Sequence, residues 1–359
     1  MRPRKFPFER VLVFVPFADG DQHLHNHYYD FDYPGYREDV SGWFEPLKLP
    51  HQWVEITPSG LPDAIEAADE AHAAGGVVVV NLCDGSPGDE YPGLEVVEAL
   101  EAAALPYTGA DPAFYRITSS KIAMKKRFRD AGLPTASWQV IHEAERDLWA
   151  AGQTLDYPLI LKLDGASGSL GLSAASIVRD HAAALSQFAA LGKELPMKHG
   201  PVLAEPFLPG REFATFVRYE EPARVVALAS CERVYNADAT AHLLFGALDQ
   251  ARYAPVEASL DAKLQRLALS AFAAVGGVGY GRIDTRQDRD GGVMLLEVNA
   301  NCGLSDDIGG STVGCILQLC DSCMAEQMRA ILTHGWRRWQ EHGGRTAAGR
   351  RTLAAMVRS

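Results

Sequence analysis

The strongest turn signal in the chain is the run Asp290-Gly291-Gly292, which separates two apolar segments. A turn of this composition joins antiparallel strands, because glycine adopts the backbone angles that tight hairpins require. The sequence therefore predicts a hairpin whose strands are residues 279–285 and 293–298. No other feature constrains the C-terminal part of the fold as strongly.

The predicted hairpin carries polar side chains on strands that are otherwise apolar. Glu297 and Asn299 lie two residues apart and share one face of their strand, and pairing of the strands can bring Asp284 alongside them. Two carboxylates and an amide oxygen suit Mg²⁺, which takes a few protein oxygens and completes its shell with water and phosphate. The alternative is a pair of solvated surface carboxylates, which the apolar flanking residues disfavour.

The first part of the chain alternates strands with helices. Residues 11–15 and 77–80 are predicted strands, and residues 63–74 and 94–104 are predicted helices. This order predicts a parallel α/β lobe. Ligands of such lobes bind beyond the carboxyl ends of the strands, which here lead into two polar loops, residues 17–33 and 81–91.

The pattern changes after residue 118. A helix is predicted first, ending at Gly132 with Pro134 just beyond, and a mixture of strands and helices follows. In chain order the predicted helices are 119–131, 180–191, 260–275 and a helical-looking stretch at 312–332, and the predicted strands before the hairpin are 159–163, one after Leu172, 202–205, 212–219 and 225–230.

Two segments have the composition of a nucleotide site. Lys162 ends an apolar strand and is followed by the Gly- and Ser-rich residues 164–171. The backbone N–H groups of such a loop can converge on phosphate oxygens while the lysine adds a positive charge, although a plain hairpin turn fits the loop as well. Glu205 and Glu212 flank an apolar connector, a pattern that suits an adenine edge followed by ribose hydroxyls.

Charge and composition narrow the class of partner. The chain has a formal net charge of -12, so its surface as a whole offers no electrostatic basis for a general grip on nucleic acid or anionic membrane. We find no apolar run of signal-peptide length at the N-terminus and no span of the roughly 18 apolar residues that cross a bilayer. We therefore expect a cytoplasmic protein that acts on small molecules.

Cysteine usage agrees with a reducing compartment. Six cysteines are too few for a disulfide scaffold in a chain of 359 residues. Cys315, Cys320 and Cys323 have a spacing that could bind a metal ion, but their helical-looking stretch lacks a fourth ligand. Small buried side chains are the favoured interpretation.

These motifs, taken in order with residues 105–110 (LPYTGA) and 131–135 (AGLPT), resemble the D-alanine:D-alanine ligase branch of the ATP-grasp superfamily. The resemblance runs from about residue 77 to about residue 332. It implies an α/β ATP-grasp fold of three lobes followed by a tail. The implied boundaries are an N-terminal parallel α/β substrate lobe at 1–112, a central lid lobe at 113–206, a C-terminal mixed or antiparallel sheet lobe with the metal site at 207–333, and a basic tail at 334–359.

The resemblance also implies a role for individual residues, with ATP and two Mg²⁺ ions as cofactors. Lys121 and Lys162 match the phosphate-binding lysines, and Arg282 matches the arginine that faces the acyl phosphate and the tetrahedral intermediate. The remaining matches are Gly168 and Ser169 at the tip of the phosphate lid, Glu205, Phe207 and Leu208 in the adenine linker, Glu212 as the ribose acid, and Asp284, Glu297 and Asn299 as metal ligands.

The substrate-binding loops depart from that family. The family's Gly-Gly-x-Ser-x-Glu pattern after the first strand is replaced by residues 16–27, and its His-Gly loop and its Pro-Gly-Met-Thr-Ser-His-Ser segment also change. We therefore expect a substrate other than D-alanine, and the Asp- and His-rich replacement loops suggest a molecule with a cationic group. The candidate substrate residues are Asp19, Asp84, Ser305 and Asp306.

The expected activity is ATP-dependent ligation of a carboxylate to an amine, with release of ADP and phosphate. A kinase that phosphorylates a small molecule is the main alternative, because it would use the same lysines and metal. A nucleotide-binding sensor without catalysis is the second alternative. We expect a homodimer, a hydrogen-bonded loop around His23, His25 and His27 in preference to a metal site, and a solvated or oligomer-facing helix for the tail from His334.

Overall fold

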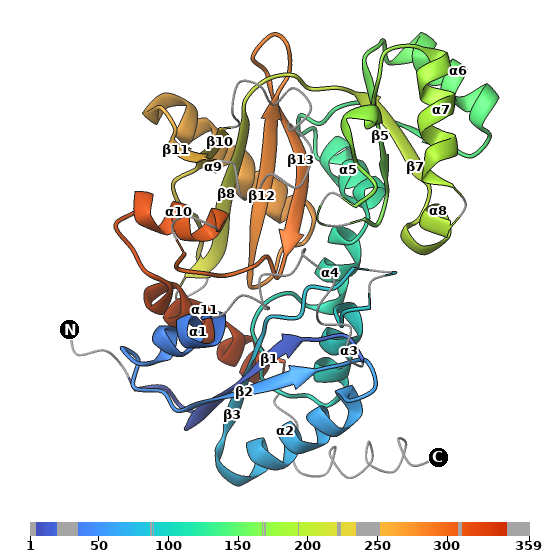
Figure 1. Ribbon diagram of the computed structural model, residues 1–359. Helices are drawn as coiled ribbons and strands as arrows, with labels where there is room; N and C mark the ends of the chain where they lie inside the picture. The colour runs from blue at the N-terminus through green and yellow to red at the C-terminus, as the bar shows by residue number, and fades with distance from the viewer. Residues whose placement is uncertain are drawn as a thin grey trace.

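Three β-sheets organise the protein in a computed structural model (Figure 1). One sheet is parallel and the other two are antiparallel, apart from isolated bridges. The structure describes residues 5–19, 35–86, 88, 90–166, 168, 170–192, 194–220, 224–234, 252–307 and 311–342. The three histidines predicted to form a hydrogen-bonded loop, His23, His25 and His27, lie outside this part of the chain.

The parallel sheet has the strand order β2-β1-β3, with β1 at Arg10–Pro16, β2 at His51–Ile56 and β3 at Val77–Asn81. Every residue of β3 is buried, as expected for a parallel strand covered on both faces. This confirms the predicted parallel α/β lobe. Its helices are α1 at Tyr36–Phe44, α2 at Leu61–Gly75 and α3 at Leu94–Ala102. Neither the helix α1 nor the strand β2 was predicted from the sequence.

Two helices lead from the parallel sheet to the central part of the chain. The first is α4 at Pro112–Thr118 and the second is α5 at Lys121–Asp130, which begins where the Ser120 side chain accepts a hydrogen bond from the backbone N–H of Ala123. The central sheet has the order β4-β7-β5-β6, with β4 at Gln139–Ile141, β5 at Leu159–Leu163, β6 at Ile177–Val178 and β7 at Val202–Pro206. Its helices are α6 at Ala144–Thr154, α7 at His181–Leu191 and α8 at Glu194–His199.

The third and largest sheet has the order β11-β10-β8-β12-β13, with β9 beside β8. Its strands are β8 at Glu212–Glu220, β9 at Arg224–Ala227, β10 at Cys231–Val234, β11 at Arg252–Pro255, β12 at Tyr280–Gln287 and β13 at Val293–Ala300. The helix α9 at Ala258–Ala274 packs on this sheet.

The predicted hairpin is confirmed as β12 and β13. At its turn, the Asp288 carboxylate accepts hydrogen bonds from the backbone N–H groups of Asp290 and Gly292, and Gly291 has φ 83°. Asp284 stands opposite Glu297, and Arg282 stands opposite Asn299. A register shift after Asp284 bends the pairing at this point.

The predicted helix at 312–332 is wrong in one respect, because it is two helices. The first, α10, spans Thr312–Leu319, and the second, α11, spans Met324–Glu341. The turn between them places Asp321 at φ 49°, and α11 begins where the backbone N–H of Met324 donates to the Asp306 carboxylate. The predicted tail boundary at residue 334 falls inside α11.

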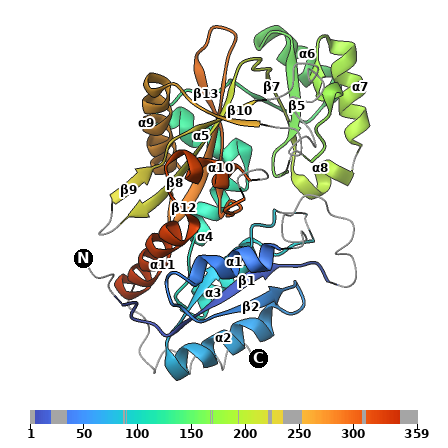
Figure 2. The ribbon, with the colours of Figure 1, turned by 60° about the vertical axis from the view of Figure 1, so that its left-hand side comes forward.

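The helix α11 joins the parallel sheet to the large sheet. It packs on α1, β3 and β8 (Figure 2). Near its end, Arg338 donates to the carbonyl of Gly109 and Trp339 donates to the carbonyl of Ala104. Two hydrophobic cores each contain residues from the part around the parallel sheet and from the part around the large sheet. The central sheet has a separate core. No helix in the described ranges is long and apolar enough to cross a bilayer.

Candidate active site

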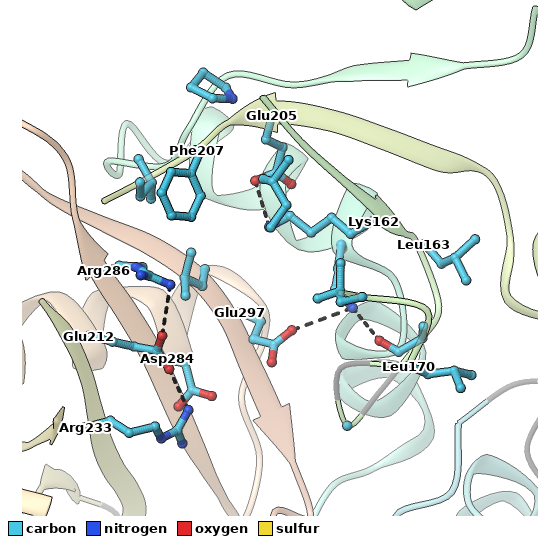
Figure 3. A pocket seen from close by; sticks show the side chains of 18 residues that line it. Lys162, Leu163, Leu170, Glu205, Phe207, Glu212, Arg233, Asp284, Arg286 and Glu297 are labelled. Carbon is cyan, nitrogen blue, oxygen red and sulfur yellow. Dashed lines mark hydrogen bonds and ion pairs between the residues drawn. The ribbon is translucent and has the colours of Figure 1, made fainter. Parts of the chain in front are cut away.

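A cavity lies between the central sheet and the large sheet (Figure 3). Strands β5 and β7 contribute one side of its lining, and β8, β10, β12 and β13 contribute the other. The predicted site residues that line it are Lys121, Lys162, Gly168, Glu205, Phe207, Leu208, Glu212, Asp284 and Glu297. Ser169 lies outside the described residues, and Arg282 and Asn299 lie beside Asp284.

Glu205 is a buried carboxylate held between two lysines. Its Oε2 atom lies 2.9 Å from Nζ of Lys162 and 3.2 Å from Nζ of Lys125, and the Lys125 side chain is fully buried. Burial opposes the charged form of Glu205, but the two lysines keep the pKa of this carboxyl below its ordinary value. Burial lowers the pKa of Lys125, and the charge of Glu205 opposes that shift.

Lys125 was missed by the sequence prediction. It lies one helical turn after Lys121 on α5, so spacing alone could have placed the two side chains on the same face. Its ammonium also donates to the Thr135 hydroxyl and to the carbonyl of Ala136. Lys125 thus ties α5 to the segment that leads into the central sheet.

Lys121 bridges the loop after β5 and the large sheet. Its ammonium donates to the carbonyl of Ala166 at 2.6 Å and lies 3.7 Å from the Glu297 carboxylate. Asp164, at the start of the same loop, accepts from the backbone N–H of Ile122 and from the Ser120 hydroxyl. The loop and the start of α5 are therefore fixed to each other, and Lys121 lines the cavity.

Arg282 and Asp284 form a two-point ion pair. The Nε and Nη2 atoms of Arg282 donate to the two carboxylate oxygens of Asp284, each at 2.8 Å. The amide of Asn299 donates to Asp284 at 3.1 Å. Burial would raise the pKa of Asp284, but the guanidinium of Arg282 holds it below its ordinary value. The pair exists because alternate residues of β12 share one face of the sheet.

Glu212 is held by two arginines from the neighbouring strands. Arg233 on β10 and Arg286 on β12 both stand opposite Glu212 on β8 in the sheet register. Arg233 donates to Oε1 of Glu212 at 2.6 Å, and Arg286 donates to Oε2 at 3.3 Å. Both arginines line the cavity, and both were missed. Spacing could have pointed to Arg286, because it lies on the same face of its strand as Arg282 and Asp284. No comparable spacing pointed to Arg233.

The candidate substrate residues lie outside the cavity lining. Asp19, just after β1, accepts from the hydroxyl of Ser59, which lowers the pKa of its carboxyl. Asp306 caps α11, and burial raises the pKa of its carboxyl. Ser305 accepts from the backbone N–H of Asp307, and Asp84 follows β3. Asp19 and Asp306 thus have structural partners within the protein.

The three cysteines weighed as a metal site lie along α10 and the turn after it. Cys315 is buried, Cys323 is exposed, and Cys320 accepts a hydrogen bond from the backbone N–H of Ala229. Across the described ranges, no group of three or more His, Cys, Asp or Glu side chains is arranged to hold a metal ion. The predicted oxygen site at Asp284, Glu297 and Asn299 is not such a group, because only two of its three residues are acids and the third is an amide.

Solved structures identify the fold. The D-alanine–D-alanine ligase of Bacillus anthracis, solved as a complex with ATP, matches 93% of this chain and 100% of its own with a TM-score of 0.68 and 18% identity. The D-alanine–D-alanine ligase of Coxiella burnetii matches 79% of this chain and 73% of its own, with a TM-score of 0.58 and 18% identity. These structures show the fold of the chain. Its sequence relatives, together with this fold, show the class: an ATP-dependent ligase of the ATP-grasp type that forms carbon–nitrogen bonds.

Sequence comparison identifies the family. The family model described as D-ala D-ala ligase C-terminus matches residues 128–307. The D-alanine–D-alanine ligase of Desulfovibrio desulfuricans is 32% identical over 254 residues, which are 69% of this chain and 74% of the relative. That of Idiomarina loihiensis is 32% identical over 213 residues, 58% of this chain and 65% of the relative. The chain belongs to the D-alanine–D-alanine ligase family.

Proposed function

We propose that this ligase activates a carboxylate as an acyl phosphate, releases ADP, and transfers the acyl group to an amine with loss of phosphate. One observation carries the proposal: a single cavity is lined by Lys121, Lys162, Asp284 and Glu297 and by the apolar connector after β7. Transfer of a phosphoryl group to a carboxylate brings anions together, so the site must supply fixed positive charge. The lysines and arginines of the lining, with the buried Lys125 beside them, supply this positive charge.

The charge balance of the cavity favours a polyphosphate. Among the described residues, six cations line the cavity or contact its acids, against four carboxylates, whereas the whole chain has a net charge of -12. The cations are Lys121, Lys125, Lys162, Arg233, Arg282 and Arg286, and the carboxylates are Glu205, Glu212, Asp284 and Glu297. A locally positive site in an acidic protein attracts an anionic ligand to this place.

The oxygen donors fit a divalent cation. Asn299 donates to Asp284 through its amide nitrogen, so its amide oxygen is not used in that contact. Glu297 stands opposite Asp284 and faces the cavity. We infer that Asp284, Glu297 and Asn299 would hold two Mg²⁺ ions, which when bound would offset the charge of the transferred phosphoryl group. We infer that Arg282, which is paired with Asp284, stabilises the oxyanion that forms when the amine attacks.

The substrate side supports a molecule other than D-alanine. The N-terminal loops lack the family's substrate pattern, and the equivalent place after β1 carries Asp19, which is bonded to Ser59. Asp84, in the loop after β3, also adds a carboxylate where the family has its His-Gly loop. We infer small, amino-acid-like substrates of which one carries a cationic group.

An isotope experiment tests the acyl phosphate directly. The purified protein is incubated with ATP, Mg²⁺ and a pool of candidate carboxylates and amines, and condensed products are identified by mass spectrometry. The carboxylate of the productive pair is then labelled with ¹⁸O, and the inorganic phosphate is analysed. We expect one labelled oxygen in the phosphate. A stable phosphorylated product without condensation, or phosphate free of label, would contradict the proposal. Condensation of D-alanine with itself at the highest rate in the pool would contradict the substrate inference.

A further inference from the structure

The Glu212 carboxylate has each of its oxygens bound by a different arginine, from a different strand. Arg233 and Arg286 lie 21 and 74 residues away in the chain, and both face Glu212 across the sheet. Arg286 is 4% exposed and Glu212 is 8% exposed. Since a long side chain buried in this way loses its freedom to rotate, the carboxylate is fixed in one orientation at the wall of the cavity.

Arg286 also connects this carboxylate to the connector after β7. Its Nε atom donates to the carbonyl of Gly210 at 3.2 Å, and its guanidinium lies over the ring of Phe207 with 5.4 Å to the ring centroid. Phe207 and Arg286 both line the cavity, as Figure 3 shows. One guanidinium therefore contacts two residues of the connector, Phe207 and Gly210, and the acid at the head of β8.

One donor of Arg286 is left over. Its Nη2 atom is buried and has no hydrogen-bond partner among the residues that the structure describes. A buried donor without an acceptor is unfavourable, so a ligand that brings an acceptor to this place gains binding energy. The neighbouring phenyl ring and carboxylate suit a nucleoside, which has a flat base, ring acceptors and sugar hydroxyls.

We propose that Arg286 is the positioning residue for sugar recognition in the nucleotide site of this chain. It holds the Glu212 carboxylate in the orientation in which this group accepts hydrogen bonds from the ribose hydroxyls, and its Nη2 atom donates to an acceptor on the same nucleoside. This inference rests on the proposed function, because it assumes that ATP occupies the cavity. Arginine is required at this position because a planar fork can stack and donate at once, which an ammonium cannot do.

Nucleotide binding tests the proposal without knowledge of the substrates. Dissociation constants for ATP, 2′-deoxy-ATP and 3′-deoxy-ATP are measured by calorimetry with Mg²⁺ for the parent, Arg286→Met, Arg286→Lys and Glu212→Gln. The parent should bind ATP at least about tenfold more tightly than one of the deoxy nucleotides, as expected for a hydrogen bond to a charged group. Arg286→Met should weaken ATP binding about tenfold and bring the ratio of the constants close to one. Arg286→Lys should recover little of the ratio.

The control is Arg289→Met, which removes an exposed arginine near the tip of the same hairpin and should leave the ratio unchanged. If Arg286→Met fails to fold, as judged by its melting temperature, Arg286→Lys carries the same comparison. A parental ratio retained in Arg286→Met or Arg286→Lys would overturn the proposal, as would a parent that binds ATP without preference for either hydroxyl. Neither result changes the outcome of the labelled-phosphate experiment, which tests the proposed ligase reaction separately. A parent that binds no ATP would overturn both the ligase proposal and the role proposed for Arg286.

Discussion

Arg282 donates one hydrogen bond to each carboxylate oxygen of Asp284, both at 2.8 Å, and the two residues lie two positions apart on β12. The residue expected to stabilise the oxyanion and a residue expected to bind metal are therefore joined in one ion pair, in which Asp284 is buried. Removing Arg282 leaves the buried Asp284 charge without its main partner, which is costly. A variant of one residue alone would mix an effect on stability with an effect on catalysis.

Arg282→Met should reduce turnover on the order of a hundredfold or more, because the oxyanion loses its fixed cation, while ATP affinity stays close to parental. Arg282→Lys should rescue little, since an ammonium cannot bind both oxygens of Asp284 in parallel. Turnover, ATP affinity and melting temperature are measured together. The double variant Arg282→Met with Asp284→Asn should regain part of the melting temperature and none of the turnover. Turnover that recovers with stability would make Arg282 a purely structural residue.

Asp284→Asn and Glu297→Gln should each raise the Mg²⁺ concentration needed for half-maximal ATP binding, about tenfold or more, because one oxygen ligand loses its charge. Titration of Mg²⁺ at fixed ATP, followed by calorimetry, measures the change. Asp290→Asn, an exposed acid at the turn of the same hairpin, is the matched control and should bind as the parent does. Parental Mg²⁺ dependence in both site variants would show that the ions bind elsewhere.

Lys125→Met should lower the free energy of unfolding by about 2 to 3 kcal/mol, because Glu205 keeps only Lys162 as a partner. Adding Glu205→Gln should recover part of this loss, while the exposed neighbour substitution Lys126→Met should have little effect. Denaturant unfolding measures each value. A full loss in the double variant would mean that Lys125 stabilises the protein through packing alone.

The same lysine predicts a difference at alkaline pH. Burial, opposed by Glu205, lowers the pKa of Lys125 from 10.5 in the folded state, so between the lowered pKa and about 10.5 the unfolded chain binds more protons. The parent should therefore gain stability relative to Lys125→Met as the pH rises through this window. A difference in unfolding free energy that does not change with pH would contradict the direction of the shift.

His334 predicts a loss of stability in mild acid. Burial, with the charges of Arg338 and Arg337, lowers its pKa from 6.5 to about 3. Below pH 6.5 the unfolded chain takes up a proton that the folded protein does not, so stability falls until about pH 3. Between pH 7.5 and pH 5 the parent should lose about 2 kcal/mol more than His334→Phe. Phenylalanine keeps a ring against Tyr219, whose centroid lies 4.2 Å away. Equal losses in the two proteins, with the exposed His142→Phe as control, would refute this expectation.

The sequence by itself determined the elements whose signals are local. The hairpin of β12 and β13 follows from a turn that only small residues can make, and the parallel lobe follows from apolar strands that alternate with helices. The order of the acidic and basic residues along these elements was equally visible. Each of these features depends on residues close together in the chain, where spacing and backbone preference are sufficient.

The tertiary structure alone decided which charges from different strands and helices meet. Glu212 pairs with Arg286 across 74 residues and Lys125 pairs with Glu205 across two different parts of the fold, so neither contact has a signature in local spacing. Pairing depends on which strands are neighbours and in what register, because a shift of one residue turns every side chain of a strand to the opposite face. The break between α10 and α11 is likewise tertiary, since the cap of the second helix is the distant Asp306.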